Sequence, residues 1–136
     1  MNIVGSWILK FMRQEIDGKL EYDEMNAFYV LLHIMQELDY RNIYDKHLTK
    51  TRAHLEIISE ILESGHPEFY EHLQDEVDVD LAPYFTNVIM TMFIANIQDS
   101  DPEIAANIFD VFLIDGEKVI FTLLLKFFTL KQDKLL

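Results

Sequence analysis

The chain has 136 residues, of which 50% are hydrophobic and 12% aromatic, so it carries enough apolar material to fold around a core. Its formal charge of −13 would repel nucleic acid and anionic membranes, and its lack of cysteine excludes disulfides and thiolate metal sites. Only 4 glycines and 3 prolines interrupt long stretches of helix-forming residues. The composition predicts an all-α fold, a single helical bundle of about six to eight helices forming one domain over residues 1–136.

The first two helices are predicted from capping residues and apolar stripes. We expect Asn2 to cap a helix that runs to about Glu15, where Asp17-Gly18 ends it with turn chemistry. We expect Asp23 to cap a second helix, whose apolar positions recur at helical spacing as far as Leu38.

The middle of the chain alternates short and long elements. Residues 40–46 are predicted to form a loop or a single-turn helix, and residues 48–63 a longer amphipathic helix that Ser64-Gly65 ends. Pro67 stands where the first residue of a short helix would be, because proline is tolerated there. Residues 76–80 (EVDVD) are interpreted as an acidic connection.

Three helices are predicted in the last third of the chain. Asp80 is the expected cap of a strongly apolar helix that reaches Ile97 and lies at the centre of the bundle. Asp101-Pro102-Glu103 is a start signal for the next helix, which Asp115-Gly116 ends. A last helix is expected over residues 117–130.

No pattern in the sequence indicates a self-sufficient enzyme. The five histidines are scattered without the one-turn spacing of a metal pair, and neither a Gly-rich phosphate loop nor a GxSxG motif occurs. We therefore expect no catalytic residue, no metal and no cofactor.

Positive charge is concentrated between Arg41 and His54. Within this stretch Lys46 and Lys50 are one helical turn apart and are expected to share a face. The stretch is either a solvated helix face paired with nearby acids or a contact surface for an acidic partner.

Five segments form an ordered set of motifs along nearly the whole chain. They are Met1-Asn2 before an apolar helix, Asn26–Leu32 (NAFYVLL), Pro67–Leu73 (PEFYEHL), Thr86–Phe93, and Ile108–Leu113 (IFDVFL) with Gly116. In this order they resemble the C-terminal part of the TBC domain, the helical module that accelerates GTP hydrolysis on Rab-type GTPases. The resemblance rests on these positions of the family-fold motif: Asn2, Phe28, Pro67, Phe93, Phe109, Asp110 and Gly116.

The resemblance implies a structural role for the motif residues. We expect Gly116 to supply the positive φ of a helix end and Asp110 to bond backbone groups of a neighbouring helix. Tyr29, Val88 and Phe109 stand where the family has tryptophan, and these changes approximately keep apolar volume, so the bundle should survive.

The family's catalytic residues have no counterpart in this sequence. The resemblance implies an arginine finger from I-x-x-D-x-x-R and a glutamine finger from Y-x-Q, both upstream of Met1-Asn2. Three arginines lack the motif context, and Gln14 has no preceding tyrosine pattern. We therefore expect a chain that is not an enzyme by itself.

The sequence is compatible with three hypotheses. The chain is a fragment of a GTPase activator, a non-catalytic protein-binding module, or a small structural or adaptor subunit of a large assembly. The expected partner is a Rab-type GTPase or the subunits of such an assembly. Helices missing from the bundle would leave an apolar face, for which Ile3 and Trp7 on the first helix are the candidates. We expect a cytoplasmic location in vesicle trafficking, with contact to membranes or the cytoskeleton through partners as an open alternative.

Overall fold

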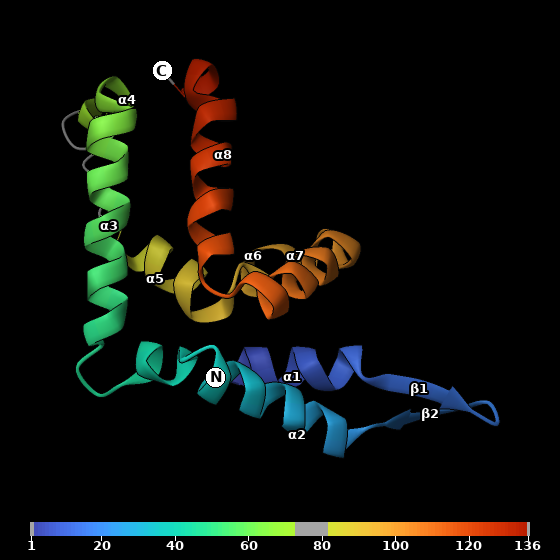
Figure 1. Cartoon of the computed structure of the whole chain (residues 1–136). Coiled ribbons are helices and arrows are strands. Elements are labelled where there is room, and N and C mark those ends of the chain that lie inside the picture. The colour runs from blue at the N-terminus through green and yellow to red at the C-terminus, as the bar shows by residue number, and fades with distance from the viewer. Residues whose placement is uncertain (1, 73–81, 136) are drawn as a thin grey trace.

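The computed structural model describes residues 2–72 and 82–135, and this part of the chain is all-α, as predicted, apart from one small hairpin (Figure 1). Its eight α-helices lie within the predicted number. None of these helices has both the length and the apolar character needed to cross a membrane. The α-helices are α1 Asn2–Phe11, α2 Glu24–Leu32, α3 Thr49–Gly65, α4 Pro67–Glu71, α5 Ala82–Thr91, α6 Ile94–Ile97, α7 Pro102–Asp115 and α8 Lys118–Leu135.

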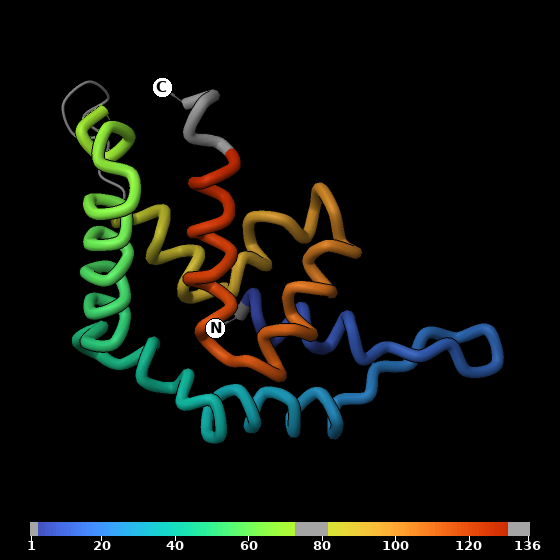
Figure 2. The backbone as a smooth tube through the Cα atoms, turned by 45° about the horizontal axis from the view of Figure 1, so that its top comes forward, coloured from blue at the N-terminus to red at the C-terminus, as the bar shows by residue number. Residues whose placement is uncertain are grey.

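The helices form two groups that meet in the middle of the molecule. α1 and α2 pack side by side, while α3 and α8 stand as two columns on the other side (Figures 1 and 2). α6 contacts α1, α5 and α7, so this short helix joins the two groups. The N-terminal part of the chain is thereby held against segments almost a hundred residues away.

The first helix is shorter than predicted, because the chain turns into a β-hairpin after Phe11. Strands β1 (Arg13–Ile16) and β2 (Lys19–Tyr22) pair antiparallel, and all their residues are exposed. Asp17 and Gly18 have φ of 51° and 74°, the two positive values that a tight two-residue hairpin turn requires. Asp17-Gly18 therefore closes a hairpin and does not end a helix. α1 begins at Asn2, so its N-cap position falls on residue 1, outside the described residues.

The second helix begins as predicted and changes its geometry near its end. The carboxylate of Asp23 accepts a hydrogen bond from the backbone N–H of Asn26 at 3.0 Å. The α-helix ends at Leu32, and residues His33–Glu37 continue it as a π-helical turn (η1). Residues Tyr40–Tyr44 form a short 3-10 helix (η2), which confirms the single-turn alternative.

The predictions for α3 and α4 are confirmed. α3 covers Thr49–Gly65, and the carboxylate of Asp45 accepts the backbone N–H of Thr49 at its start. This bond is the main reason that the pKa of Asp45 is lowered. Pro67 is the first residue of α4, as predicted. The expected connection over residues 76–80 and the expected cap Asp80 lie outside the described residues.

The single apolar helix predicted to run as far as Ile97 is two helices. Met92 and Phe93 both have positive φ, 52° and 65°, a conformation that bulky residues rarely adopt. The backbone therefore turns between α5 and α6 without glycine or proline. The central position of this segment is confirmed, because Ile89, Met92 and Ile94 are almost completely buried.

α7 and α8 follow the predicted start and stop signals. The carboxylate of Asp101 accepts the backbone N–H of Ile104 at 3.0 Å, and Pro102 is the first helical residue. Gly116 ends α7 with φ 68°, as expected, and its N–H donates to the carbonyl of Phe112. α8 extends to Leu135, beyond the predicted end.

Candidate functional site

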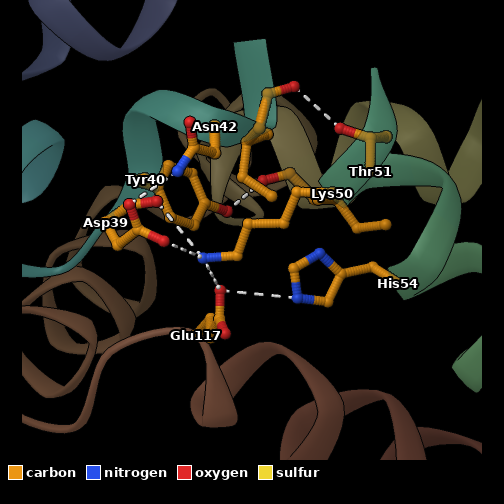
Figure 3. A network of polar contacts seen from close by, with 9 residues as sticks. Asp39, Tyr40, Asn42, Lys50, Thr51, His54 and Glu117 are labelled. Atoms are coloured by element: carbon orange, nitrogen blue, oxygen red, sulfur yellow. Dashed lines mark hydrogen bonds and ion pairs between the residues drawn. The ribbon is translucent and has the colours of Figure 1, made fainter. Parts of the chain in front are cut away.

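A polar network joins the segment before η2 and the start of α3 to the start of α8, more than 60 residues further along the chain (Figure 3). The ammonium of Lys50 on α3 lies 2.9 Å from a carboxylate oxygen of Glu117, at the start of α8, and 3.3 Å from a carboxylate oxygen of Asp39, before η2. Burial alone would lower the pKa of Lys50, but the hydrogen bonds and charges of Glu117 and Asp39 outweigh it, and the pKa is raised. Lys50 is therefore held as a cation between two carboxylates.

His54, one turn after Lys50, shares the same carboxylate. Its Nε2 lies 3.4 Å from Glu117, while its Nδ1 is buried without a hydrogen-bond partner in the described part of the chain. Its ring packs on that of Phe121, with centroids 5.0 Å apart. Burial lowers the pKa of His54 and outweighs the opposing effect of Glu117. The neutral imidazole thus fits its position, with Nε2–H toward Glu117.

Buried and half-buried hydroxyl groups next to this network tie η2 to its neighbours. The hydroxyl groups of Tyr40 and Tyr44 donate to the carbonyls of Ile89 and Met90 on α5, and the hydroxyl of Thr51 donates to the carbonyl of Ile43. Burial raises the pKa of Tyr44 to about 12, so its hydroxyl keeps the proton that it donates. The network and these bonds fix α3, α5 and the start of α8 around η2.

The predicted basic surface is not one helix face. Lys46 lies exposed in the turn before α3, whereas Lys50 lies inside that helix and is bonded to Asp39 and Glu117. Because α3 begins only at Thr49, the helical spacing assumed for the two lysines does not apply. Lys46 alone remains a predicted partner contact, and Lys50 is used within the molecule.

The two residues predicted for an apolar face on α1 are separated by the fold. Trp7 is only 6% exposed and belongs to the core, whereas Ile3 is exposed. The indole N–H of Trp7 has no acceptor among the described residues. Ile3 therefore keeps its predicted place on the surface, and Trp7 stabilises the packing of α1.

An open apolar groove lies between α1 and α2. Its volume is about 190 Å³, and we call it the α1–α2 groove. Its lining residues are Gly5, Ile8, Leu9, Glu24, Ala27, Phe28 and Leu31. Phe28 is 58% exposed, and the next residue, Tyr29, is equally exposed on the surface of α2. The motif residue Phe28 thus forms one wall of the groove. Tyr29, which stands where the family has tryptophan, lies on the surface and not in the core.

A Cβ atom added to Gly5 would meet nothing within 4 Å. Glycine inside a helix destabilises it by roughly 0.5–1 kcal/mol relative to alanine. No neighbour within the described molecule requires the small residue, so the groove is open at this point.

The remaining motif residues differ in burial. Phe109 is buried and packs edge-on against Phe11, with ring centroids 6.3 Å apart. Phe93 makes the turn before α6. Asp110 lies exposed on α7, and its carboxylate forms no hydrogen bond with the described residues, in contrast to the expected bond to a neighbouring helix. Its position on the solvent side of α7, between Phe109 and Phe112, explains this difference.

The described residues contain no group of histidine, aspartate and glutamate that is placed to hold a metal ion. Glu117, the central residue of the polar network, is not among the residues predicted from the sequence. Its acidic character and its position after Gly116 were visible in the sequence, but its pairing with Lys50 depends on how α8 folds back onto α3.

The fold and the ordered motifs define the class of protein. The Rab-GTPase-TBC domain model matches residues 1–136, and the chain belongs to this family.

Among curated proteins, it is similar to TBC1 domain family member 2B of Mus musculus, with 27% identity over 118 residues. It has the same identity to TBC1 domain family member 2A of that species over 115 residues, and 28% identity to member 4 over 105 residues. These matches cover 86%, 84% and 75% of this chain but only 12%, 12% and 8% of the relatives, so the chain spans a small part of their length. No solved structure matches the chain.

Proposed function

We propose that this chain is a protein-binding module of the TBC family that does not accelerate GTP hydrolysis by itself. The resemblance implies that family members use an arginine finger and a glutamine finger on the transferring phosphate and the attacking water. Neither I-x-x-D-x-x-R nor Y-x-Q occurs in the 136 residues. The chain would therefore provide a binding surface without the groups that stabilise the transition state.

The α1–α2 groove is the observation that carries the proposal of binding. Exposed apolar side chains that line a groove favour a protein partner, because their burial would contribute about 25 cal/mol for each Å² removed from water. Gly5 leaves room for close approach, and Phe28 offers an aromatic contact of the kind that dominates interfaces. The partner we propose is a Rab-type small GTPase, bound in the cytoplasm, where the family acts in vesicle trafficking.

The absence of activity is tested by single-turnover GTP hydrolysis. A panel of Rab-type GTPases would be measured with and without a molar excess of this chain. We expect no rate increase above about tenfold, which corresponds to ~1.4 kcal/mol of barrier. A larger acceleration of any member of the panel would contradict the non-catalytic role.

Binding at the groove is tested with Phe28→Glu and with a matched control. Tyr84 on α5 is another exposed aromatic residue, 65% against 58%, and lies outside the groove, so Tyr84→Glu makes the same chemical change elsewhere. With GTPases immobilised in their GTP-analogue form, we expect Phe28→Glu to weaken binding at least about tenfold and Tyr84→Glu to leave it unchanged. Equal effects of the two substitutions would contradict binding at the α1–α2 groove. If the chain bound no GTPase, the role of a structural or adaptor subunit would be favoured.

A further inference from the structure

α7 and α8 meet at Gly116 and then diverge, so their facing sides form a corner (Figures 1 and 2). Two open hollows, of about 220 and 440 Å³, lie in this corner. They share three lining residues and are therefore continuous. We call this site the α7–α8 corner, and its principal residues are Ile104, Val111, Val119, Leu123, Lys118 and Lys126.

The floor of the corner is apolar, and its residues are spaced by one or two helical turns, as in a helix–helix contact. Ile104 and Val111 lie two turns apart on one side of α7 and are 49% and 45% exposed. Val119 and Leu123 are one turn apart on the facing side of α8. Apolar residues at this spacing are the pattern of a helix side that packs against another helix. Here the two sides diverge, and much of the apolar surface of α7 remains open to solvent.

The mouth of the corner is positively charged, in contrast to the chain as a whole. The charged residues that line the two hollows are two lysines and one aspartate, although the complete chain has a formal charge of −13. Lys118 and Lys126 line the larger hollow, with Asp115 as the acidic residue beside them. Within the described residues neither lysine forms an ion pair, whereas Lys50 is bonded to two carboxylates. The ammonium groups at the corner are available to an external partner.

We propose that the α7–α8 corner binds an acidic amphipathic helix of another protein. The apolar stripe of that helix would cover Ile104 and Val111, and its carboxylates would pair with Lys118 and Lys126. The two lysines are eight residues apart, so about 12 Å of helix axis separates them. Two carboxylates seven residues apart on one face of the partner lie about 10.5 Å apart along its axis, within reach of the two flexible lysine side chains. A second copy of this acidic chain is disfavoured, because two such molecules repel each other.

The test uses a synthetic peptide of about 20 residues, long enough to form a helix in an alanine-rich sequence. The fluorescein-labelled peptide carries a leucine stripe and two glutamates seven residues apart, and a second peptide has lysines in place of the glutamates. In fluorescence anisotropy we expect saturable binding of the glutamate peptide and at least about tenfold weaker binding of the lysine peptide. Absence of saturable binding, or equal binding of both peptides, would overturn the proposal.

Variants of the chain identify the site. We expect Val111→Glu to weaken the glutamate peptide at least about tenfold, because it adds a repelling charge to the apolar floor. Ile57→Glu is the matched control, since Ile57 on α3 is exposed to a similar extent (43%) but lies outside the corner. Lys126→Glu should weaken the glutamate peptide and strengthen the lysine peptide, while Lys19→Glu on the exposed strand β2 should change neither. Equal effects of Val111→Glu and Ile57→Glu, with both variants folded by circular dichroism, would place the peptide elsewhere and overturn the assignment.

Discussion

Lys50, His54 and Glu117 determine how α3 is held against the start of α8. Glu117 receives both the ammonium and the imidazole, so a single carboxylate organises two side chains of α3. The sequence identified the positive stretch that contains Lys50, but not its partner, because the two residues are 67 positions apart. Contacts of this range depend on the packing of the whole bundle, and a local pattern does not contain them.

His54 makes the stability of the fold depend on pH. Burial lowers its pKa in the folded chain below the ordinary value of 6.5, so the unfolded chain takes up a proton first as the pH falls. The stability that the neutral His54 contributes is fully present above pH 6.5. It is lost progressively as the pH falls from 6.5 toward the lower pKa of His54 in the folded chain. We expect the midpoint of urea unfolding to decrease from pH 7 to pH 5, and His54→Phe to reduce this decrease.

His47→Phe is the control for this effect. His47 is exposed in the turn before α3, so His47→Phe makes the same chemical change outside the buried network and is measured alongside. A His54→Phe variant with an unchanged pH dependence would contradict the assignment to His54.

At the scale of single elements, the helix start signals were the most reliable predictions. Asp23 and Asp101 accept backbone N–H groups of the first turn, and Pro67 and Pro102 are first helical residues. These features depend on chemistry within a few residues, and the sequence contains all of it.

Two features of the chain path were not predicted. Asp17-Gly18 is a strong local hairpin signal, but the apolar residues before it also fit a helix, and a helix was predicted as far as Glu15. Nothing in the sequence marked the break at Met92 and Phe93, which contains no glycine or proline.

The N-cap of α7 gives a prediction at this scale. Asp101→Ala removes the acceptor for the N–H of Ile104, and we expect a loss of about 1 kcal/mol in the free energy of unfolding. Asp99→Ala removes the same charge from an exposed position in the preceding turn, and we expect it to be nearly neutral. Chemical denaturation of both variants measures the difference. Equal losses would show that charge, and not the cap, is responsible.

At the scale of the whole molecule, composition predicted the fold class but not the placement of surfaces. The apolar content and the few breakers were sufficient to predict an all-α fold, which the structure confirms. Composition did not predict that Trp7 is buried while Phe28 lines an open groove, because both residues lie on apolar helices. Which side of a helix remains open is decided by the neighbours that the fold brings to it.

The excess of acidic residues predicts a dependence of stability on salt. Repulsion among like charges opposes the compact state, and salt reduces the screening length from about 30 Å at 0.01 M to about 8 Å at 0.15 M. We expect the melting temperature at pH 7 to rise with sodium chloride over this range, by roughly 4 °C if the relief is about 1 kcal/mol. Near pH 4.6, the sequence pI, this rise should disappear. A melting temperature independent of salt at pH 7 would contradict the argument.

The exposed hairpin has a practical consequence. All the residues of β1 and β2 lie on the surface, and the turn at Asp17-Gly18 projects away from the helices (Figure 1). Segments of this kind accept additional residues without disturbing the core. An epitope or a small fluorescent domain inserted between Asp17 and Gly18 would mark the protein in cells while the α1–α2 groove and the α7–α8 corner remain free.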